Sequence, residues 1–391
     1  MTRRVIITAL TLAIPALALG AAGACKRLQP GDPLRGLSAA ERARFDSGRV
    51  VFDSTFTPAV GLGPLFNASA CGECHEDPAS GGAGDEVERH AALFHPESAG
   101  LVCDQLADSG GPVFQDSVTP ALHTALGIDH EELPAGVTTV ARRTTADVLG
   151  FGLLDAVPDS VILAYADPDD RNGDGISGRP NRFLDGRLGR FGRKAFVPTL
   201  REFNDGAFQA EMGITSPAVP DEITVTGRPV PAGTDPAPEP ELTAHGLELA
   251  DAFVRLLAPP EPLTQSREAR EGRDVFARAG CAGCHVPVLR TGDNPIPALR
   301  HKNVAAYTDL LLHDMGADLA DICFGLATPS EFRTEPLMGL RLSTHFLHDG
   351  RATTPEQAID LHGGEAARSR DLFRSLPAPD RAALLAFLKT L

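Results

Sequence analysis

The stretch GRDVFARAGCAGCH occupies residues 272–285 and ends in two cysteines and a histidine spaced Cys-x-x-Cys-His. Its parts occur once before in the chain, as GRVVF at 48–52 and CGECH at 71–75. Eighteen residues separate the two parts in the first copy and four in the second. A repeat of this kind predicts a chain built from two related halves.

Both Cys-x-x-Cys-His motifs carry the same side chains. They are Cys71, Cys74 and His75 in the first half, and Cys281, Cys284 and His285 in the second. This spacing is the attachment signal of c-type haem, in which the thiols bond the porphyrin and the histidine binds the iron as proximal ligand. A zinc ion shared by both cysteine pairs is an alternative, but it leaves the histidines without a role. Thioredoxin-like redox chemistry is another, but it needs a βαβ context that the sequence lacks. We therefore predict two covalently bound haem c groups.

Apolar periodicity adds a closing helix to each half. LELADAFVRLLAPP (247–260) and RAALLAFLKTL (381–391) both place apolar residues at i, i+3, i+4 and i+7. The opening helix of the first half begins at Ser38, and Glu41 completes a capping box; REAREGRDVF (267–276) is its counterpart. We expect a mainly α fold of two cytochrome c-like domains, at 38–260 and 261–391, with long loops, insertions and at most one short hairpin.

The N-terminus predicts export. Residues 1–24 have a basic start, an apolar stretch and a small-residue end, as a signal peptide does. A transmembrane anchor is the alternative. Cys25 follows small residues, so it is a candidate site for a lipid anchor, and residues 25–37 would then form a tether. We expect a periplasmic protein, lipid-anchored to the membrane if Cys25 is modified.

Charge and composition limit the partners. The formal net charge of −16 argues against nucleic acid and anionic lipid as ligands. Beyond the signal peptide, no apolar run approaches membrane-spanning length. The two cysteines outside the motifs and the signal junction are Cys103 and Cys323, which in an oxidising compartment either pair as a disulfide or stay as separate buried thiols.

An acidic loop, DPDDRNGDGISGRPN, spans residues 167–181. Asp170, Asn172 and Asp174 alternate along it and a glycine follows, in the D-x-N-x-D-G pattern of a calcium loop. The twelfth position is Asn181 in place of the usual glutamate, so the loop is not a full EF-hand. The pattern predicts a Ca²⁺ site, and a solvated acidic turn is the alternative.

Several stretches resemble one protein family. They include GLGPLFNASACGECH (61–75), ARRTTADVLGFGLLDAVPD (141–159), GRLGRFGRKA (186–195), YTDLLLHDMGADLAD (307–321) and FLHDGRATTPEQAIDLHGGEA (346–366). The chain resembles the bacterial di-haem c-type cytochrome peroxidase superfamily, and within it the di-haem oxidoreductase branch often labelled thiol oxidoreductases. The resembling stretches run in the expected order along nearly the whole chain after the signal peptide.

The resemblance implies a division of labour. A small electron-transfer protein, a cytochrome c or a cupredoxin, would pass electrons to the C-terminal haem. The N-terminal haem would then reduce peroxide or another small substrate, and calcium commonly sits between the two domains. Two alternatives stay open, a non-catalytic di-haem electron carrier and an oxidase of a thiol or other donor.

The resemblance also implies roles for individual residues. The sixth ligand of the C-terminal haem should follow the HDG turn (348–350), at His362; Met315, Met338 and His313 are alternatives. Relatives often have an acid at the position of Asp155, which would move protons during peroxide cleavage, with helix capping as its alternative role.

Four further residues bear on the predicted site. Arg143 would stabilise negative charge or pair with a haem propionate. His90 and His95 follow the first motif and are candidate distal ligands of the N-terminal haem, although a surface loop would explain them equally well. Arg193 stands where relatives usually have tryptophan, and because the chain contains no tryptophan, a tryptophan relay between the haems is excluded.

Overall fold

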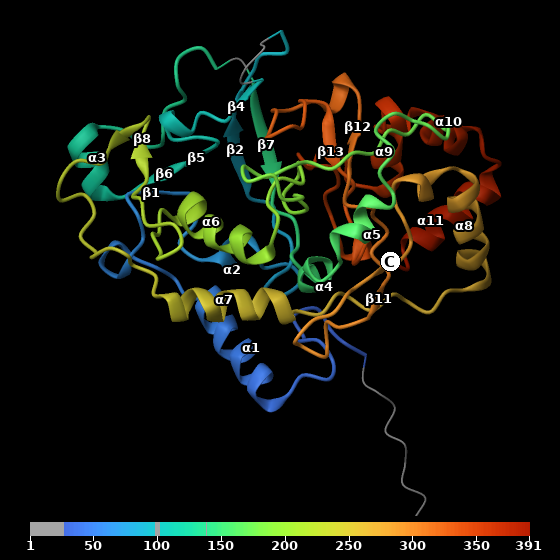
Figure 1. Ribbon diagram of the computed structural model, residues 1–391, viewed down its shortest axis with the longest axis horizontal. Coiled ribbons are helices and arrows are strands. Elements are labelled where there is room, and N and C mark those ends of the chain that lie inside the picture. Colours follow the sequence, from blue (N-terminus) through green and yellow to red (C-terminus); the bar gives the residue numbers. More distant parts are fainter. Residues whose placement is uncertain (1–26, 98–101, 138) are drawn as a thin grey trace, which may run out of the picture.

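The computed structural model describes residues 27–97, 102–137 and 139–391 (Figure 1). The predicted signal peptide and Cys25 lie outside these residues. Within them the chain forms eleven α-helices: α1 (Ala39–Phe52), α2 (Cys71–Cys74), α3 (Pro120–Leu126), α4 (Phe151–Asp155), α5 (Asp159–Leu163), α6 (Leu200–Met212), α7 (Ala244–Leu256), α8 (Arg267–Arg278), α9 (Pro355–Asp360), α10 (Ala367–Ser375) and α11 (Ala378–Leu388). None of these described helices is long and apolar enough to cross a membrane.

Short strands and 3₁₀ turns fill the long connections. The strands are β1 (Leu65–Phe66), β2 (Val87–Ala91), β3 (Leu93–Phe94), β4 (Cys103–Asp104), β5 (Val113–Phe114), β6 (Ser117–Val118), β7 (Val140–Thr144), β8 (Thr224–Val225), β9 (Arg228–Pro229), β10 (Leu289–Arg290), β11 (Asn303–Val304), β12 (Leu312–Asp314) and β13 (Glu331–Arg333). The 3₁₀ turns are η1 (Pro58–Val60), η2 (Ala107–Ser109), η3 (Cys281–Gly283), η4 (Ala317–Leu319), η5 (Leu340–Leu342) and η6 (Gly364–Ala366).

The strands correct the expectation of a single hairpin. In the described chain they form one antiparallel three-stranded sheet, ordered β5-β2-β7, and five two-stranded pairs. Most of these strands have two or three residues. A segment that short has no room for the alternation of apolar and polar residues that marks a strand in sequence. The helical part of the prediction is confirmed, because α1, α7, α8 and α11 form where the periodicity placed them.

Each half is organised around one helix pair. α1 packs against α7 and α8 packs against α11, as Figure 1 shows at the lower centre and at the right. The capping box predicted at the start of α1 is confirmed, because Ser38 and Glu41 exchange side-chain and backbone hydrogen bonds. The repeated segments GRVVF and GRDVF are therefore the C-terminal parts of the first helix in each pair.

The glycine of the repeat makes these contacts possible. A Cβ added at Gly48 would overlap the carbonyl oxygen of Leu249 in α7. A Cβ added at Gly272 would overlap the carbonyl oxygen of Ala383 in α11. Only glycine lets two helix backbones approach this closely. A glycine at the same position of the repeat thus allows the same close helix contact in both halves.

Hydrophobic packing connects the halves as well as filling each of them. The largest buried cluster includes Phe45 and Phe253 from the first half together with Leu289 and Leu299 from the second. A smaller cluster belongs to the second half alone and surrounds Phe276 and Phe387 of α8 and α11. The core is therefore continuous across the predicted boundary near residue 260.

We expect Gly272→Ala to lower the free energy of unfolding by about 1–3 kcal/mol, because the added methyl group must force α8 away from α11. Gly206→Ala is the matched control. Gly206 also lies within a helix, α6, but nothing lies within 4 Å of its added Cβ, so this change should be neutral or stabilise the protein by about 0.5–1 kcal/mol. Denaturant unfolding of the two variants measures the difference. Equal stabilities would contradict the packing role of Gly272.

Candidate haem sites

Each Cys-x-x-Cys-His motif forms a single helical turn after the first helix of its pair, 18 residues beyond α1 in the first half and two residues beyond α8 in the second. The first motif is α2 and the second begins in η3. In both, the backbone N–H of the histidine donates to the carbonyl of the first cysteine over 3.0 Å, from His75 to Cys71 and from His285 to Cys281. This turn places the two thiols and the imidazole on one short segment, which is the arrangement that a covalently attached haem requires.

The repeat also positions each histidine ring. Phe52 of GRVVF lies 6.0 Å from the His75 ring, and Phe276 of GRDVF lies 6.5 Å from the His285 ring, measured between ring centroids. His75 Nδ1 lies 3.1 Å from the Gly82 carbonyl oxygen, and His285 Nδ1 lies 2.9 Å from that of Tyr307. When Nδ1–H donates to a carbonyl, Nε2 keeps its lone pair for a metal.

The motif cysteines do not have the properties expected of a zinc site or of a thioredoxin-like redox site. Zinc would need both pairs at one place, but among the described residues their sulfur atoms do not converge into a common ligand group. Burial raises the pKa of Cys71 and Cys74 to about 12 and that of Cys281 to about 11. Redox-active thiols have lowered pKa values, so these cysteines are poor thioredoxin-like nucleophiles. Their geometry fits haem attachment.

A cavity of about 480 Å³ lies against the second motif and contains His285 and His362 in its lining. Its volume is in the range of cofactor sites. His362 Nδ1 lies 2.7 Å from the Ala358 carbonyl oxygen, so its Nε2 is free in the same way as that of His285. Burial lowers the pKa of both imidazoles, that of His285 to about 4, which keeps them neutral and able to bind a metal.

The alternative ligands of this cavity differ in their availability. Met315 and Met338 line it too. His313 also lines it, but both of its ring nitrogens already face carboxylates, Asp309 at 2.8 Å and Glu365 at 2.9 Å. A nitrogen that donates to a carboxylate has no lone pair for iron. Of the alternatives to His362, the two methionines therefore stay open and His313 does not.

Charged side chains form another part of the cavity wall. Arg193 and Arg333 both pair with Glu335, at 3.2 Å and 2.7 Å. Arg333 Nε is buried and has no hydrogen-bond partner. Nearby, burial raises the pKa of Asp147 to about 7. Two guanidinium groups in the lining of one cavity suit an anionic group such as a haem propionate. Arg193 thus has a charged role where relatives usually have tryptophan.

The first motif is surrounded by carboxyl groups that the sequence analysis missed. Glu211, in the last turn of α6, accepts a hydrogen bond from Asn67 Nδ2 at 2.9 Å and interacts with Cys71 and Cys74 through its charge. Burial, with Glu88 nearby, raises the pKa of Glu211 well above its usual range. Glu211 lies next to Met212 and three residues after Phe208, both buried on α6, so the sequence offered only a weak signal from its position at the edge of the buried face.

Glu88 has the opposite electrostatic environment. It lies on β2 beside His90, whose Nε2 is 2.8 Å from its carboxylate. Burial alone would raise the pKa of Glu88, but the hydrogen bond and the charges of His90, His75 and Arg143 lower it. The pKa values of the two carboxyls near the first motif are therefore shifted in opposite directions, that of Glu88 downward and that of Glu211 upward. His90 is buried against Glu88 with an unpartnered Nδ1, whereas His95 is exposed.

Asp155 and Arg143, which the sequence analysis placed in the catalytic site, form hydrogen bonds and ion pairs with other parts of the chain. Asp155 accepts from the backbone N–H of Leu200 at 2.9 Å, at the start of α6, and pairs with Arg255. Helix capping was the alternative role that the sequence analysis gave for Asp155. The bonds to Leu200 and Arg255 together occupy both of its carboxylate oxygens. Arg143 pairs with Asp321 at 2.7 Å, and both side chains are almost fully buried. The predicted role of Arg143 beside peroxide or a propionate stays a prediction.

The side chains of the acidic loop at 167–181 accept hydrogen bonds from backbone N–H groups of the same loop. Gly175 N–H donates to Asp170, Asp174 N–H to Asn172 Oδ1 and Ile176 N–H to Asp174 Oδ1, over 2.9–3.2 Å. In the described chain, its carboxylates do not converge on a common point. Calcium binding by Asp170, Asn172 and Asp174 stays a prediction. The remaining cysteines, Cys103 and Cys323, form a disulfide across 220 residues of sequence.

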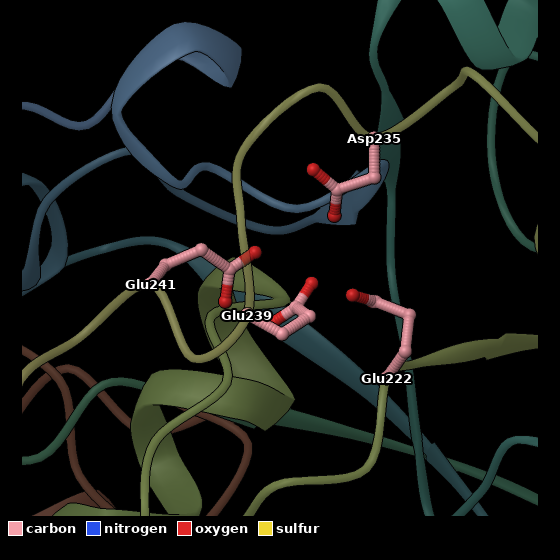
Figure 2. Close-up of side chains that lie close together, drawn as sticks. All are labelled: Glu222, Asp235, Glu239 and Glu241. Carbon is pink, nitrogen blue, oxygen red and sulfur yellow. The ribbon is translucent and has the colours of Figure 1, made fainter.

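A separate acidic cluster lies in the long loop before α7. It consists of Glu222, Asp235, Glu239 and Glu241, whose carboxylate oxygens lie within 4.8 Å of one another (Figure 2). One oxygen each of Glu222, Asp235 and Glu241 is buried without a hydrogen-bond partner. Burial and the neighbouring carboxylates raise the pKa of Glu222 to about 9, and burial raises that of Glu241 to about 7. Protons can therefore offset the repulsion in this cluster.

We expect this cluster to make stability fall as pH rises. A carboxyl whose pKa is raised in the folded state binds more protons there than in the unfolded chain, so the free energy of unfolding falls from about pH 4.5 to about pH 9. Glu222→Gln should reduce the loss between pH 5 and pH 9 by about 1 kcal/mol, after allowance for solvent screening. Urea unfolding at each pH, with EDTA present to remove metal ions, measures the free energy of unfolding. Glu356→Gln, at an exposed position, is the control and should follow the wild-type curve. Parallel pH curves for wild type and Glu222→Gln would refute the prediction.

Comparison with known proteins places these sites in context. A family described as "Di-haem oxidoreductase, putative peroxidase" matches residues 133–391, more than half of the chain. A cytochrome-c peroxidase of Denitromonas iodatirespirans is 26% identical over 153 residues. That match covers 32% of this chain and 39% of the length of the relative.

Solved structures resemble the chain more distantly. The diheme peroxidase BthA of Burkholderia thailandensis is 16% identical with a TM-score of 0.42, and the match covers 94% of this chain and 89% of that one. A hydrazine synthase chain of Kuenenia stuttgartiensis is 13% identical with a TM-score of 0.41, covering 98% of this chain and 100% of that one. Similarity at this level does not establish a shared activity.

Proposed function

The chain belongs to the di-haem oxidoreductase family, and from this premise we propose that it is an exported di-haem c-type oxidoreductase with peroxidase-like activity. A small electron-transfer protein, a cytochrome c or a cupredoxin, would deliver electrons to the C-terminal haem. They would pass to the N-terminal haem, where peroxide is reduced. Reduction of one hydrogen peroxide consumes two electrons and two protons and releases two water molecules.

The observation that carries this proposal is the matched geometry of the two motif histidines. Each has Nδ1 held by a backbone carbonyl and a phenylalanine of the repeat beside its ring. In this proposal His75 and His285 are the proximal ligands of the two haem irons, and the four motif cysteines form the thioether bonds. Haem supplies the redox-active iron that no side chain can replace.

In this proposal electrons would pass between the two haems without a tryptophan. Glu76 and Asp77, which directly follow His75 in sequence, line the same cavity as His285. The segment that follows the first motif thus reaches the cavity of the second, which supports direct electron transfer between the two haems in this proposal. In this arrangement Arg193 and Arg333 would hold a propionate of the C-terminal haem, and Ca²⁺ bound by the 167–181 loop would support the second half next to it.

Proton transfer in peroxide reduction needs a base and an acid. We assign the base to Glu88, whose pKa is lowered, and the acid to Glu211, whose pKa is raised. Glu88 would accept a proton from the bound peroxide, and Glu211 would donate one to the oxygen that leaves. Two carboxyls with separated pKa values allow both tasks at one pH. This assignment replaces the earlier one to Asp155.

Glu211→Gln should lower kcat for peroxide reduction by about 10²–10⁴-fold, because an amide cannot give up a proton in place of the carboxyl. Haem content and absorption spectrum should be unchanged. The exposed Glu248→Gln in α7 is the matched control and should retain full activity. Stopped-flow kinetics with peroxide and a reduced small cytochrome measure the rates. Full activity in Glu211→Gln would remove Glu211 from the proton pathway.

His362→Ala should convert the C-terminal haem from low-spin to high-spin, because the iron loses its sixth ligand. Electron paramagnetic resonance of the ferric holoprotein measures the spin state. Met315→Leu and Met338→Leu should leave the haem low-spin. A high-spin haem in either methionine variant, with His362→Ala unchanged, would transfer the ligand role to that methionine.

The same spectra separate an enzyme from an electron carrier. A peroxidase needs an open sixth position on the N-terminal haem, so we expect a high-spin signal from it in the ferric or the half-reduced protein. Two haems that stay low-spin in both states would mean a non-catalytic electron-transfer cytochrome. Turnover of a thiol without any turnover of peroxide would favour the thiol oxidase instead.

A further inference from the structure

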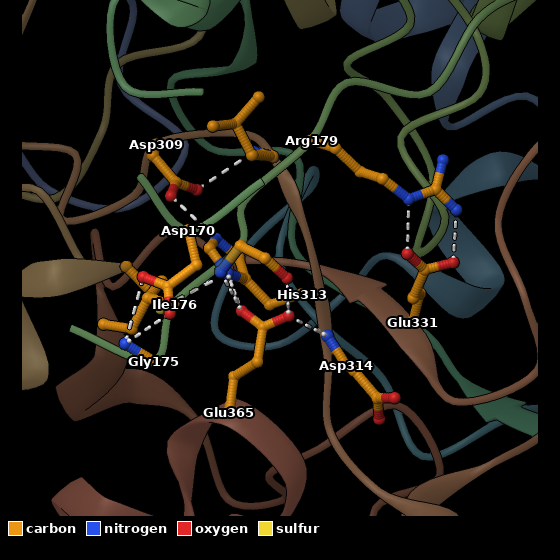
Figure 3. Close-up of polar contacts among 12 residues, drawn as sticks. Asp170, Gly175, Ile176, Arg179, Asp309, His313, Asp314, Glu331 and Glu365 are labelled. Atoms are coloured by element: carbon orange, nitrogen blue, oxygen red, sulfur yellow. Dashed lines mark hydrogen bonds and ion pairs between the residues drawn. The ribbon is translucent and has the colours of Figure 1, made fainter. Parts of the chain in front are cut away.

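Three charged side chains form a closed arrangement beside the second haem motif (Figure 3). His313, in β12, lies between Asp309 and Glu365. Its Nε2 is 2.8 Å from Asp309 Oδ2 and its Nδ1 is 2.9 Å from Glu365 Oε2. The His313 and Asp309 side chains are 4% and 2% exposed, and that of Glu365 is 14% exposed. We call these residues the His313 clamp.

The clamp holds its histidine in the charged form. Two carboxylates accept hydrogen bonds and cannot donate them, so both ring nitrogens of His313 must carry protons. Burial alone would lower the pKa of His313, but its bonds to Asp309, Cys284 and Glu365 raise it to about 12. The hydrogen bonds from His313 and Ser177 lower the pKa of Glu365 to about 2. The arrangement therefore contains one buried cation between two anions.

The clamp touches both sides of the proposed haem site. His313 Nδ1 lies 3.6 Å from Cys284 Sγ, the second thioether position of the motif. Glu365 is three residues after His362. It also accepts two hydrogen bonds from Ser177, one from Oγ at 2.7 Å and one from the backbone N–H at 2.9 Å. His313, Glu365, His285 and His362 all line the same cavity. One cation thus links the attachment segment to the segment that carries the candidate sixth ligand.

We propose that His313 is a positioning residue for the C-terminal haem, which holds the Glu365 turn so that His362 stays over the iron. The proposal rests on the function proposed above, through haem attachment at Cys281 and Cys284 and ligation by His362. It assigns no direct contact with iron to His313.

The reason is electrostatic. Without the imidazolium, Asp309 and Glu365 face each other as buried carboxylates with no counter-charge, which costs more than the loss of one neutral hydrogen bond. Of the two carboxylates, Glu365 is the less buried, with 14% of its side chain exposed against 2% for Asp309, so it is the one that turns toward solvent. Ser177 and the Asp314 N–H also donate to Glu365, and these neutral bonds do not replace the charge of the imidazolium. A displaced Glu365 moves the nearby His362 with it.

The experiment measures the spin state and the reduction potential of the C-terminal haem in holoprotein that carries two haems by mass and pyridine haemochrome spectrum. His313→Gln should raise the ratio of high-spin to low-spin C-terminal haem about tenfold, because it leaves buried charge unpaired. His313→Gln combined with Glu365→Gln should restore the low-spin state, since the clamp then has the same net charge of −1 as in the wild type and its amides can hydrogen-bond to Asp309. His301→Gln, an exposed histidine beside Asp293, is the control and should change nothing.

The outcomes separate the proposal from its premises. A low-spin haem with unchanged potential in His313→Gln, when His362→Ala is high-spin, overturns the clamp and leaves the proposed function intact. No recovery in the double variant also overturns it, because lost packing would then explain the change. If His362→Ala stays low-spin, or no haem is attached, the premise has failed. If His313→Gln yields no holoprotein, Glu365→Gln gives a second test, because it removes the charged bond between His313 and the turn. A smaller rise in high-spin haem is expected, and no rise overturns the clamp.

Discussion

The close contact between two helix backbones at a single glycine is the constraint on which both haem sites depend. Gly48 meets α7 and Gly272 meets α11, and a side chain at either position would overlap a backbone carbonyl of the partner helix. Four residues after each glycine a phenylalanine lies beside the ring of the motif histidine. Helix crossing, aromatic packing and imidazole orientation are thus consecutive consequences of one short segment, which explains why GRxVF is repeated.

The two halves surround their motifs with different chemistry. Around the second motif the cavity has two neutral histidines with free Nε2 atoms, an arrangement suited to a six-coordinate, electron-transferring iron. Around the first motif the neighbours are Glu88 and Glu211, whose protonation preferences differ. That contrast is what a division between electron entry and peroxide reduction requires, and it arises from insertions that the second half lacks.

Some of the site was readable from the sequence because it depends on local spacing. A motif histidine and its cysteines lie within one turn, so Cys71, Cys74 and His75 needed no tertiary information. Asp155 shows the limit. Its position next to an apolar helix suited catalysis or capping equally, and only the arrival of Leu200 and Arg255 from elsewhere in the chain selects capping. Glu211 was missed because its partner, the first motif, is more than a hundred residues away in sequence.

The sequence by itself determined the two haem motifs, the four framing helices with their apolar faces, and the family. These properties follow from contacts within one or two helical turns, where residue spacing fixes geometry. The tertiary structure alone decided which carboxyls surround the first motif, how Cys103 meets Cys323, and that His313 is enclosed between Asp309 and Glu365. Each of these depends on burial and on charges brought together from distant segments, and no local pattern records which segments will meet.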